Sequence, residues 1–383
     1  MPVPIDKKEC CGCSLCVEIC PVHCISMTTD VEGFRYPQVD NAACIHCEKC
    51  SKTCSFAAKR NTQSTVKECI VSQHSDIAEL AKSRSGAAFA ICSDWILKNG
   101  GAVYGAVLTP QMQVIHIRTT NLAERDLMRG SKYVQSDIEG LLADILQDAE
   151  EMPVCFSGTA CQVDAVNTYF KLKHGKVENL YTLDIICHGV PSPMMFHEYI
   201  TYLEKKEKKK VIAFDFRDKR FGWDSHTATY CVGNKVKHTT LYRKLFNEDI
   251  ILRPSCYNCH YSSLNRVSDL TIADAWNIQN VYPEMDYKNG VSLCIASTEK
   301  GKQLLERIMA ESVWKLAEIQ DFMQPNMQRP TPPGKDRDAF WRDYQRKGFE
   351  YVLNKYAKKR IWVRIANALQ YYYSHKLLNA NEK

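Results

Sequence analysis

The sequence has little of what would build a fibrous, disordered or membrane-spanning protein. Its 383 residues include only 17 glycines and 14 prolines, which leaves little room for long flexible segments. No apolar run reaches the roughly 18 residues that a membrane-spanning helix requires. The opening residues, Met-Pro-Val-Pro-Ile-Asp-Lys-Lys, hold no apolar stretch typical of a signal peptide. We therefore expect a soluble, cytoplasmic protein of two or three domains.

Excess charge is also missing from most of the chain. The formal net charge is +6, but residues 335–383 hold twelve Lys or Arg against five Asp or Glu, a net of +7. Residues 1–334 are thus close to neutral, at −1. A nucleic-acid groove would place its basic surface on the main fold, so this pattern argues against nucleic acid as a partner.

Cysteine, by contrast, is abundant, with 19 residues. Many cysteines in a chain without an export signal indicate metal ligands in a reducing compartment. Eight of them form two tandem sets with the spacing C-x2-C-x2-C-x3-C, and the second set begins 34 residues after the first. The sets are Cys10, Cys13, Cys16 and Cys20, then Cys44, Cys47, Cys50 and Cys54.

This spacing is typical of a ferredoxin with two 4Fe-4S clusters, in which three cysteines of one set share a cluster with the last cysteine of the other. The first cluster then takes Cys10, Cys13, Cys16 and Cys54, and the second takes Cys44, Cys47, Cys50 and Cys20. A pair of zinc sites is the alternative, but it leaves the last cysteine of each set unexplained. Cys11 and Cys24 fall outside the spacing. We place this ferredoxin-like domain at residues 1–62.

Strand-like and helix-like segments alternate after the ferredoxin-like domain. Strands are expected at 66–72, 102–109, 114–120, 154–156, 180–186, 211–216 and 270–273, and helices at 85–97, 137–150, 160–172 and 193–205. Alternation predicts an α/β domain with a mixed sheet covered on both faces, at residues 63–323. A hairpin is expected around Gly233. Residues 324–383 read as a Pro-containing linker and a basic helical tail, so the whole chain is α+β.

Four further cysteines stand at the ends of predicted elements, namely Cys161, Cys187, Cys256 and Cys259. The carboxyl ends of strands in a doubly wound sheet share one edge, so these four thiolates could hold a third cluster. The Cys256–Cys259 pair alone is equally compatible with zinc or a redox dithiol, and Cys161 or Cys187 alone with a core position.

Several stretches, taken in order, carry a family resemblance. They are Ser157–Gln162, Asp184–Pro191, Phe216–Lys219, Cys256-x2-Cys259 and Asp269–Trp276. In that order they resemble the coenzyme F-420 hydrogenase/dehydrogenase beta-subunit family of flavin and iron–sulfur oxidoreductases, over about residues 65–320. The resemblance implies a third 4Fe-4S cluster on Cys161, Cys187, Cys256 and Cys259. It also implies a bound flavin, usually FAD.

Two loops are candidates for binding the flavin. The loop at 83–88 opens a helix, and its amides suit a pyrophosphate. Its candidate contacts are Ser85, Gly86 and Ala87, of which Ala87 replaces a glycine common in the family. The loop at 129–136 offers Gly130, Ser131, Lys132, Tyr133 and Gln135. A helix N-cap at Ser85 and an ordinary polar loop at Ser131 are the simpler alternatives.

Three side chains are candidates for a catalytic role: His188, Arg217 and Lys219. His188 follows a ligand cysteine and could donate a hydrogen bond to a cluster or substrate, or could be structural. Arg217 and Lys219 could orient an anionic substrate beside the flavin, or could end a strand in solvent.

These cofactors define our functional hypothesis. Single electrons pass through 4Fe-4S clusters to a flavin, which reduces or oxidises an unidentified small-molecule substrate, with a ferredoxin-like donor or a partner subunit as redox partner. One alternative is an electron-transfer subunit of a larger hydrogenase or dehydrogenase complex, which could be linked to coenzyme F-420. A non-redox alternative is a zinc-binding structural protein.

An apolar stripe in the basic tail predicts an amphipathic helix. Its members are Ile361, Ile365, Ala368, Leu369 and Tyr372. We expect this helix to pack on its own domain or on a partner subunit, and contact with a membrane surface is the alternative that we do not favour.

Overall fold

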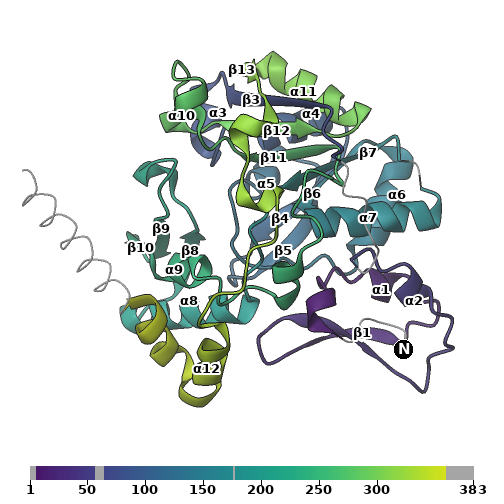
Figure 1. Ribbon diagram of the computed structural model, residues 1–383, viewed down its shortest axis with the longest axis vertical. Helices are drawn as coiled ribbons and strands as arrows, with labels where there is room; N and C mark the ends of the chain where they lie inside the picture. The colour runs from purple at the N-terminus through teal and green to yellow at the C-terminus, as the bar shows by residue number, and fades with distance from the viewer. Residues whose placement is uncertain (1–5, 57–63, 176, 359–383) are drawn as a thin grey trace, which may run out of the picture.

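The computed structural model describes residues 6–56, 64–175 and 177–358. An eight-stranded mixed sheet, in the order β13-β3-β12-β11-β7-β6-β4-β5, forms its centre (Figure 1). Its strands are β3 (Glu68–His74), β4 (Ala102–Leu108), β5 (Val114–Thr119), β6 (Val154–Thr159), β7 (Leu180–Ile185), β11 (Leu270–Asp274), β12 (Ser292–Ala296) and β13 (Ser312–Leu316). The α/β class and the mixed sheet predicted from the sequence are confirmed.

The middle of the sheet is parallel and both flanks are antiparallel. β4 pairs with β6, β6 with β7, and β7 with β11 in parallel, with Val154 opposite Leu180. The pairs β4–β5, β11–β12, β12–β3 and β3–β13 are antiparallel. Parallel pairing requires a crossover connection, and α7 (Ala160–Lys173) provides it between β6 and β7.

Helices cover both faces of the sheet, as the alternation of side chains requires. Val103 and Cys155 pack with α4 (Ala88–Lys98) and α11 (Glu299–Glu311), whereas Tyr104 and Phe156 pack with α6 (Leu141–Glu151) and α7 (Ala160–Lys173). The shorter helices are α3 (Ile77–Lys82), α5 (Leu122–Asp126) and α10 (Ile278–Val281). No helix among the described residues is long and apolar enough to cross a membrane.

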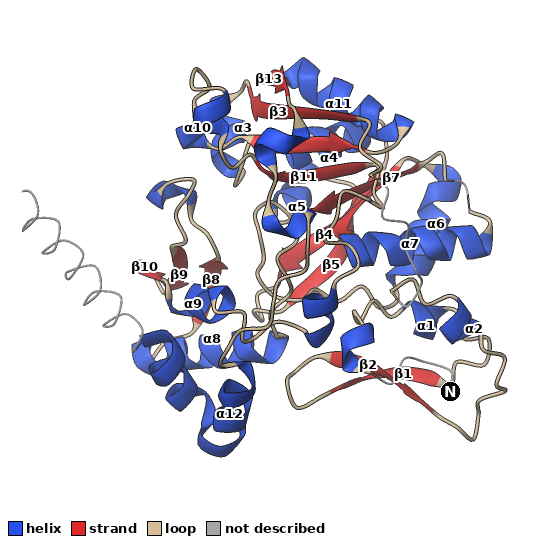
Figure 2. Cartoon of the chain, viewed as in Figure 1, coloured by secondary structure: helices blue, strands red, loops and turns tan. Residues whose placement is uncertain are grey.

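A second unit is built around a separate three-stranded sheet, seen apart from the main sheet in Figure 2. It contains β8 (Val211–Asp215) and the hairpin of β9 (Ala228–Val232) and β10 (Lys235–Thr239), with α8 (Pro193–Glu207), α9 (Leu241–Asn247) and α12 (Arg337–Val352). The hairpin expected around Gly233 is therefore present. The strand expected at 211–216 does not join the main sheet, because it pairs antiparallel with β9.

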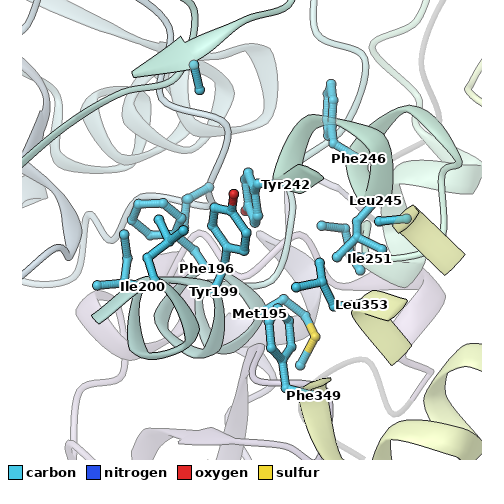
Figure 3. Packing of buried hydrophobic residues seen from close by; sticks show 14 of the residues in the cluster. Met195, Phe196, Tyr199, Ile200, Tyr242, Leu245, Phe246, Ile251, Phe349 and Leu353 are labelled. Carbon is cyan, nitrogen blue, oxygen red and sulfur yellow. The ribbon is translucent and has the colours of Figure 1, made fainter. Parts of the chain in front are cut away.

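The core of this second unit is aromatic (Figure 3). Phe196 and Tyr199 of α8 pack against Tyr242 of α9, and Phe349 of α12 lies against Tyr199. The sequence placed residues 324–383 in a linker and tail, and within that range Leu353, Tyr356 and Ala357 contribute to this core. The apolar stripe at 361–372 lies outside the described residues.

The N-terminal segment forms a small unit beside the sheet (Figure 1). Its hairpin is β1 (Ile25–Thr29) and β2 (Arg35–Val39), and its helices are α1 (Leu15–Glu18) and α2 (Lys49–Lys52). Gly33 lies so close to the start of α8 that an added Cβ would be 2.2 Å from Met194 Cβ. The Arg35 guanidinium forms ion pairs with Asp137 and Glu139. Packing and charge therefore hold this unit on the larger part of the chain.

Candidate iron–sulfur and flavin site

The second set of thiols surrounds one cavity near the surface. Its lining includes Cys20, two residues after α1, together with Cys44, Cys47 and Cys50. Cys24 also lines the cavity, and its Sγ lies 3.5 Å from Cys20 Sγ. Cys47 is exposed, whereas Cys20 and Cys50 are buried. The fold thus brings Cys20 to the later set, as the crossed assignment requires.

Three thiols of the first set, Cys10, Cys13 and Cys16, lie near Cys54 of the second. Burial raises the pKa of the Cys16 thiol, and the neighbouring Cys13, Cys10 and Cys54 raise it further because one thiolate disfavours another. Cys50 of the second set also acts on Cys16, so the two ferredoxin-like sets adjoin.

The four cysteines expected to form a third set also lie together. Cys161 is in the first turn of α7, directly after β6, and Cys187 follows β7. Cys256 and Cys259 come from a 3-10 turn and its end, and the Val190 N–H donates to Cys256 Sγ at 3.4 Å. Burial raises the pKa of the Cys187 thiol, and Cys256, Cys161 and Cys259 add to that increase. These thiols therefore lie together near the carboxyl ends of β6 and β7, at the edge of the sheet that the sequence predicted.

Cys11, which the spacing left outside both sets, occupies the junction between the first and third sets. Its buried thiol packs with Cys13 and Cys161 in one cluster of side chains. The interaction with Cys11 is the main reason that the pKa of Cys161 falls to about 7, and the Thr159 hydroxyl, 3.2 Å from Cys161 Sγ, adds to it. The ferredoxin-like segment and the sheet therefore meet through thiols.

Donor chemistry supports clusters at these three places. Thiol-only sets are the usual ligands of 4Fe-4S clusters, and each set groups four cysteines that form no disulfide. Among the described residues, no three His, Cys, Asp or Glu side chains gather tightly enough to hold one metal ion. The residues present fit 4Fe-4S clusters because each of the three places offers four thiols.

The first candidate flavin loop is bound tightly to the sheet. The Gly86 N–H donates to Ser292 Oγ at 2.9 Å, and Ser85 Oγ donates to the Val291 carbonyl at 2.7 Å. An added Cβ on Gly86 would lie 2.0 Å from the Ser72 carbonyl oxygen, so only glycine fits there. Ala87 adopts φ 70° directly before α4, whose N-terminus has no side-chain cap. Ser85 and Gly86 thus hold the loop, and the uncapped end of α4 is the part suited to an anion.

The residues of the second candidate loop lie in different environments, some exposed and some buried. Gly130 and Ser131 are exposed. Burial lowers the pKa of Lys132 to about 7, and its Nζ donates to the carbonyls of Leu127 and Arg129 at 2.8 and 2.9 Å.

The last residues of this loop point to different neighbours. The Tyr133 ring packs against Phe246 with centroids 4.9 Å apart, and the Arg243 guanidinium lies 4.1 Å above it. Gln135 instead donates to the Cys11 carbonyl at 2.9 Å. The structure therefore places Tyr133 among cations and Gln135 at the thiol junction.

Two arginines that the sequence did not single out carry unpaired donors. Arg84 Nε and Arg243 Nε and Nη1 are buried and have no hydrogen-bond partner among the described residues. Burial, followed by the nearby charge of Arg217, lowers the pKa of Arg84 to about 10. Because a buried unpaired donor is costly, these groups fit an anionic ligand such as a flavin phosphate. Arg84 lies in the 83–88 loop, which the sequence marked for its amides and not for this side chain, whereas no local motif marks Arg243.

Arg217 is fixed by a carboxylate and an aromatic stack. Its Nη1 lies 2.7 Å from Asp274 Oδ2, and its guanidinium lies 5.3 Å from the centroid of Trp276. Trp276 stacks on Trp223 with centroids 5.2 Å apart. Arg217 is thus held rigidly beside Arg84, to which it supplies a carbonyl acceptor at 3.1 Å.

The other two catalytic candidates contact protein groups. Lys219 Nζ donates to the carbonyls of Leu80 and Ser83 at 2.7 and 3.0 Å, and burial, then Arg84, lowers its pKa to about 8. His188 Nε2 lies 2.6 Å from Asp249 Oδ1. Both side chains therefore have structural partners, and a catalytic role stays a prediction for each.

Residues 151–321 match the family described as the C terminus of the coenzyme F420 hydrogenase/dehydrogenase beta subunit. This stretch, less than half of the chain, is therefore similar to a family of oxidoreductase subunits. None of the curated proteins compared with the chain matches it. A similar solved structure is a chain of the xenon-derivatised F420-reducing [NiFe] hydrogenase complex from Methanosarcina barkeri. It is 14% identical, with 80% of this chain and 95% of that chain covered and a TM-score of 0.46.

Proposed function

We propose that the chain is an iron–sulfur flavoprotein that transfers electrons as the beta subunit of a hydrogenase-type or dehydrogenase-type oxidoreductase. The observation that carries this proposal is the junction at Cys11, where thiols of the ferredoxin-like segment meet thiols of the family domain. The match of residues 151–321 to the beta-subunit family supports the role of a subunit. When bound, 4Fe-4S clusters exchange single electrons and a flavin converts them into pairs.

The three thiol sets follow one another from the surface inward. Cys47 of the second set is exposed and suits contact with a redox partner protein. Cys16 of the first set interacts with Cys50 of the second, and Cys11 connects the first set to Cys161 of the third. The chain's cysteines therefore provide a continuous route between the partner surface and the sheet edge.

The cationic aromatic region is our candidate for the flavin, FAD being the form that we favour. Tyr133 offers a ring for stacking, and Arg84 and Arg243 offer unpaired donors for phosphate. Arg217, held by Asp274, can orient an anionic substrate on the same side. In this proposal the chain's own residues bind the flavin and orient the substrate, and none acts as a nucleophile.

The experiment that tests the proposal is anaerobic reduction of the purified chain by reduced ferredoxin, followed at the absorption of clusters and flavin. Both bands should bleach in the wild type. In Cys161→Ala the flavin should be reduced at least tenfold more slowly while the ferredoxin-like clusters still bleach. Cys92→Ala is the matched control, since Cys92 is buried in α4 outside all three sets. Flavin reduction that is equally fast in Cys161→Ala would contradict the proposal.

A self-contained reductase is the second candidate. It is favoured by the ferredoxin-like segment, which is already docked on the family domain through Arg35, Asp137 and Glu139. The two functions are separated by isolating the tagged protein anaerobically from its native cell. Co-purification of a stoichiometric catalytic subunit supports the beta-subunit role, and substrate turnover by the isolated chain supports the reductase.

A further inference from the structure

The side chain of Arg253, three residues before Cys256, contacts the backbone and thiol of Cys10 in the ferredoxin-like segment. Its Nε donates to the Cys10 carbonyl at 2.7 Å, and its Nη2 donates to the Arg35 carbonyl at 2.8 Å and lies 3.7 Å from Cys10 Sγ. Its Nη1 donates to Gln135 Oε1 at 2.9 Å. The guanidinium therefore sits against the thiol of an expected ligand of the first cluster.

The loop around Cys10 is shaped to accept this guanidinium. Gly12 has φ +71°, and an added Cβ there would lie 2.7 Å from Arg253 Nη1. The rings of Tyr36 and Phe34 lie 4.3 and 5.4 Å from the guanidinium carbon. The side chain is thus enclosed by the ferredoxin-like segment, and Arg253 is only 1% exposed.

The positive charge of Arg253 has no carboxylate partner in the part of the chain that the structure describes. Every hydrogen bond that it donates goes to a carbonyl, an amide oxygen or a thiol sulfur, and no carboxylate of the described residues pairs with it. By contrast, the buried Arg266 and Arg125 are each paired with a carboxylate. Since an unpaired buried charge is strongly unfavourable, a further anionic group is needed near Cys10.

The backbone of Arg253 also forms hydrogen bonds with the segments that carry the third set of thiols. Its N–H donates to the Val190 carbonyl at 3.0 Å, and its carbonyl accepts from the Cys256 N–H at 2.9 Å. Val190 in turn donates to Cys256 Sγ. One residue thus fixes the backbone of the Cys256 loop and places its charge on the Cys10 loop.

We propose that Arg253 is the counter-charge of the cluster bound by the Cys10 loop and that it raises the reduction potential of that cluster, while positioning the ferredoxin-like segment against the third set. This inference rests on the proposed function. A cluster gains negative charge on reduction, so a fixed positive charge in a site of low dielectric favours the reduced form. Arg253 is accordingly a positioning and tuning residue that makes the first cluster a better electron acceptor from the second.

The test is a redox titration of the intact, anaerobically prepared protein, with each cluster followed by electron paramagnetic resonance. The signal lost in Cys54→Ala identifies the first cluster. In Arg253→Met the equilibrium constant for reduction of that cluster should fall at least tenfold, or about 59 mV for one electron, while in Arg253→Lys it should change much less. In the control Arg125→Lys, all potentials should stay as in the wild type, because Arg125 lies in the α4–α5 core.

Gln135→Glu provides a second route if Arg253→Met does not accumulate. It places a carboxylate against the guanidinium without removing it, so the first cluster should again become harder to reduce. An unchanged potential in either Arg253→Met or Gln135→Glu would overturn the inference. Failure of the wild-type protein to bind any cluster would instead overturn the proposed function, so the two failures are distinguishable.

Discussion

The guanidinium of Arg266 lies 2.7 Å from the carboxylate of Asp184, and both side chains are almost completely buried. Asp184 is in β7, three residues before Cys187, and Arg266 follows Cys259 and donates to the Tyr261 carbonyl at 2.8 Å. The pair therefore connects two segments that supply thiols to the third set.

Replacing Asp184 by Asn should destabilise the fold by about 3–5 kcal/mol, because it leaves the Arg266 charge buried without its partner. Urea unfolding at neutral pH measures the change. Lys67→Gln is the control, since its ion pair with Glu299 is exposed and its loss should leave the stability nearly unchanged. A loss below about 1 kcal/mol in Asp184→Asn, well short of what breaking a buried pair costs, would show that the pair does not hold these segments.

Ala87→Gly should stabilise the protein by about 1 kcal/mol. Ala87 has φ 70° and ψ 17°, a left-handed conformation that disfavours a side chain and suits glycine. Thermal unfolding gives the measurement, and Ala88→Gly at the start of α4 serves as the opposite control, expected to lose up to about 1 kcal/mol. A lower stability in Ala87→Gly would mean that packing of the Ala87 methyl group outweighs the backbone strain.

Stability should fall as the pH drops from about 6.5 toward 4, in part because of His116. Burial lowers the pKa of His116 to about 4, against the hydrogen bond between Nε2 and the Ser157 carbonyl at 2.9 Å. Between the two pKa values the unfolded chain binds a proton that the folded chain does not, so stability is complete above about 6.5 and is lost on acidification by up to about 1.4 kcal/mol per pH unit.

His116→Gln keeps a side-chain donor near Ser157 but does not titrate. The difference in unfolding free energy between wild type and variant, measured from pH 7.5 to pH 5, isolates the contribution of His116. Parallel curves for the two proteins over that range would refute the assignment.

The crossed pairing of the ferredoxin-like sets predicts which variants lose the same cluster. Cys54→Ala and Cys10→Ala should remove one and the same resonance signal, and Cys20→Ala and Cys44→Ala should remove another, each with about four irons. Cys24→Ala should keep both signals, although Cys24 lies 3.5 Å from Cys20. Loss of the same signal in Cys54→Ala and Cys44→Ala would contradict the pairing.

Local sequence patterns predicted most strands of the main sheet. They did not predict which strands pair, because pairing depends on residues far apart in the chain. The run of β6, α7 and β7 follows from periodicity over neighbouring residues. The strand at Ser292–Ala296 was missed, because a short buried run has no distinctive period. The strand at Val211–Asp215 was expected in the main sheet, yet it pairs with β9, a choice that depends on contacts far along the chain.

The same distinction applies to the candidate site. Cysteine spacing is local, so it groups the eight ferredoxin-like cysteines, whereas the grouping of the other four depended on the ends of predicted elements and on the family resemblance. Cys11, Arg243 and Arg253 act through neighbours more than 100 residues away, and no spacing marks them. The sequence analysis left Cys11 outside both sets, although Cys11 directly follows Cys10.

A count of iron, acid-labile sulfide and flavin on one anaerobically purified sample of the full chain tests the central claim most directly. The account predicts about twelve irons and twelve sulfides for each flavin, from three 4Fe-4S clusters. A protein that carries zinc, or iron without sulfide, would contradict it.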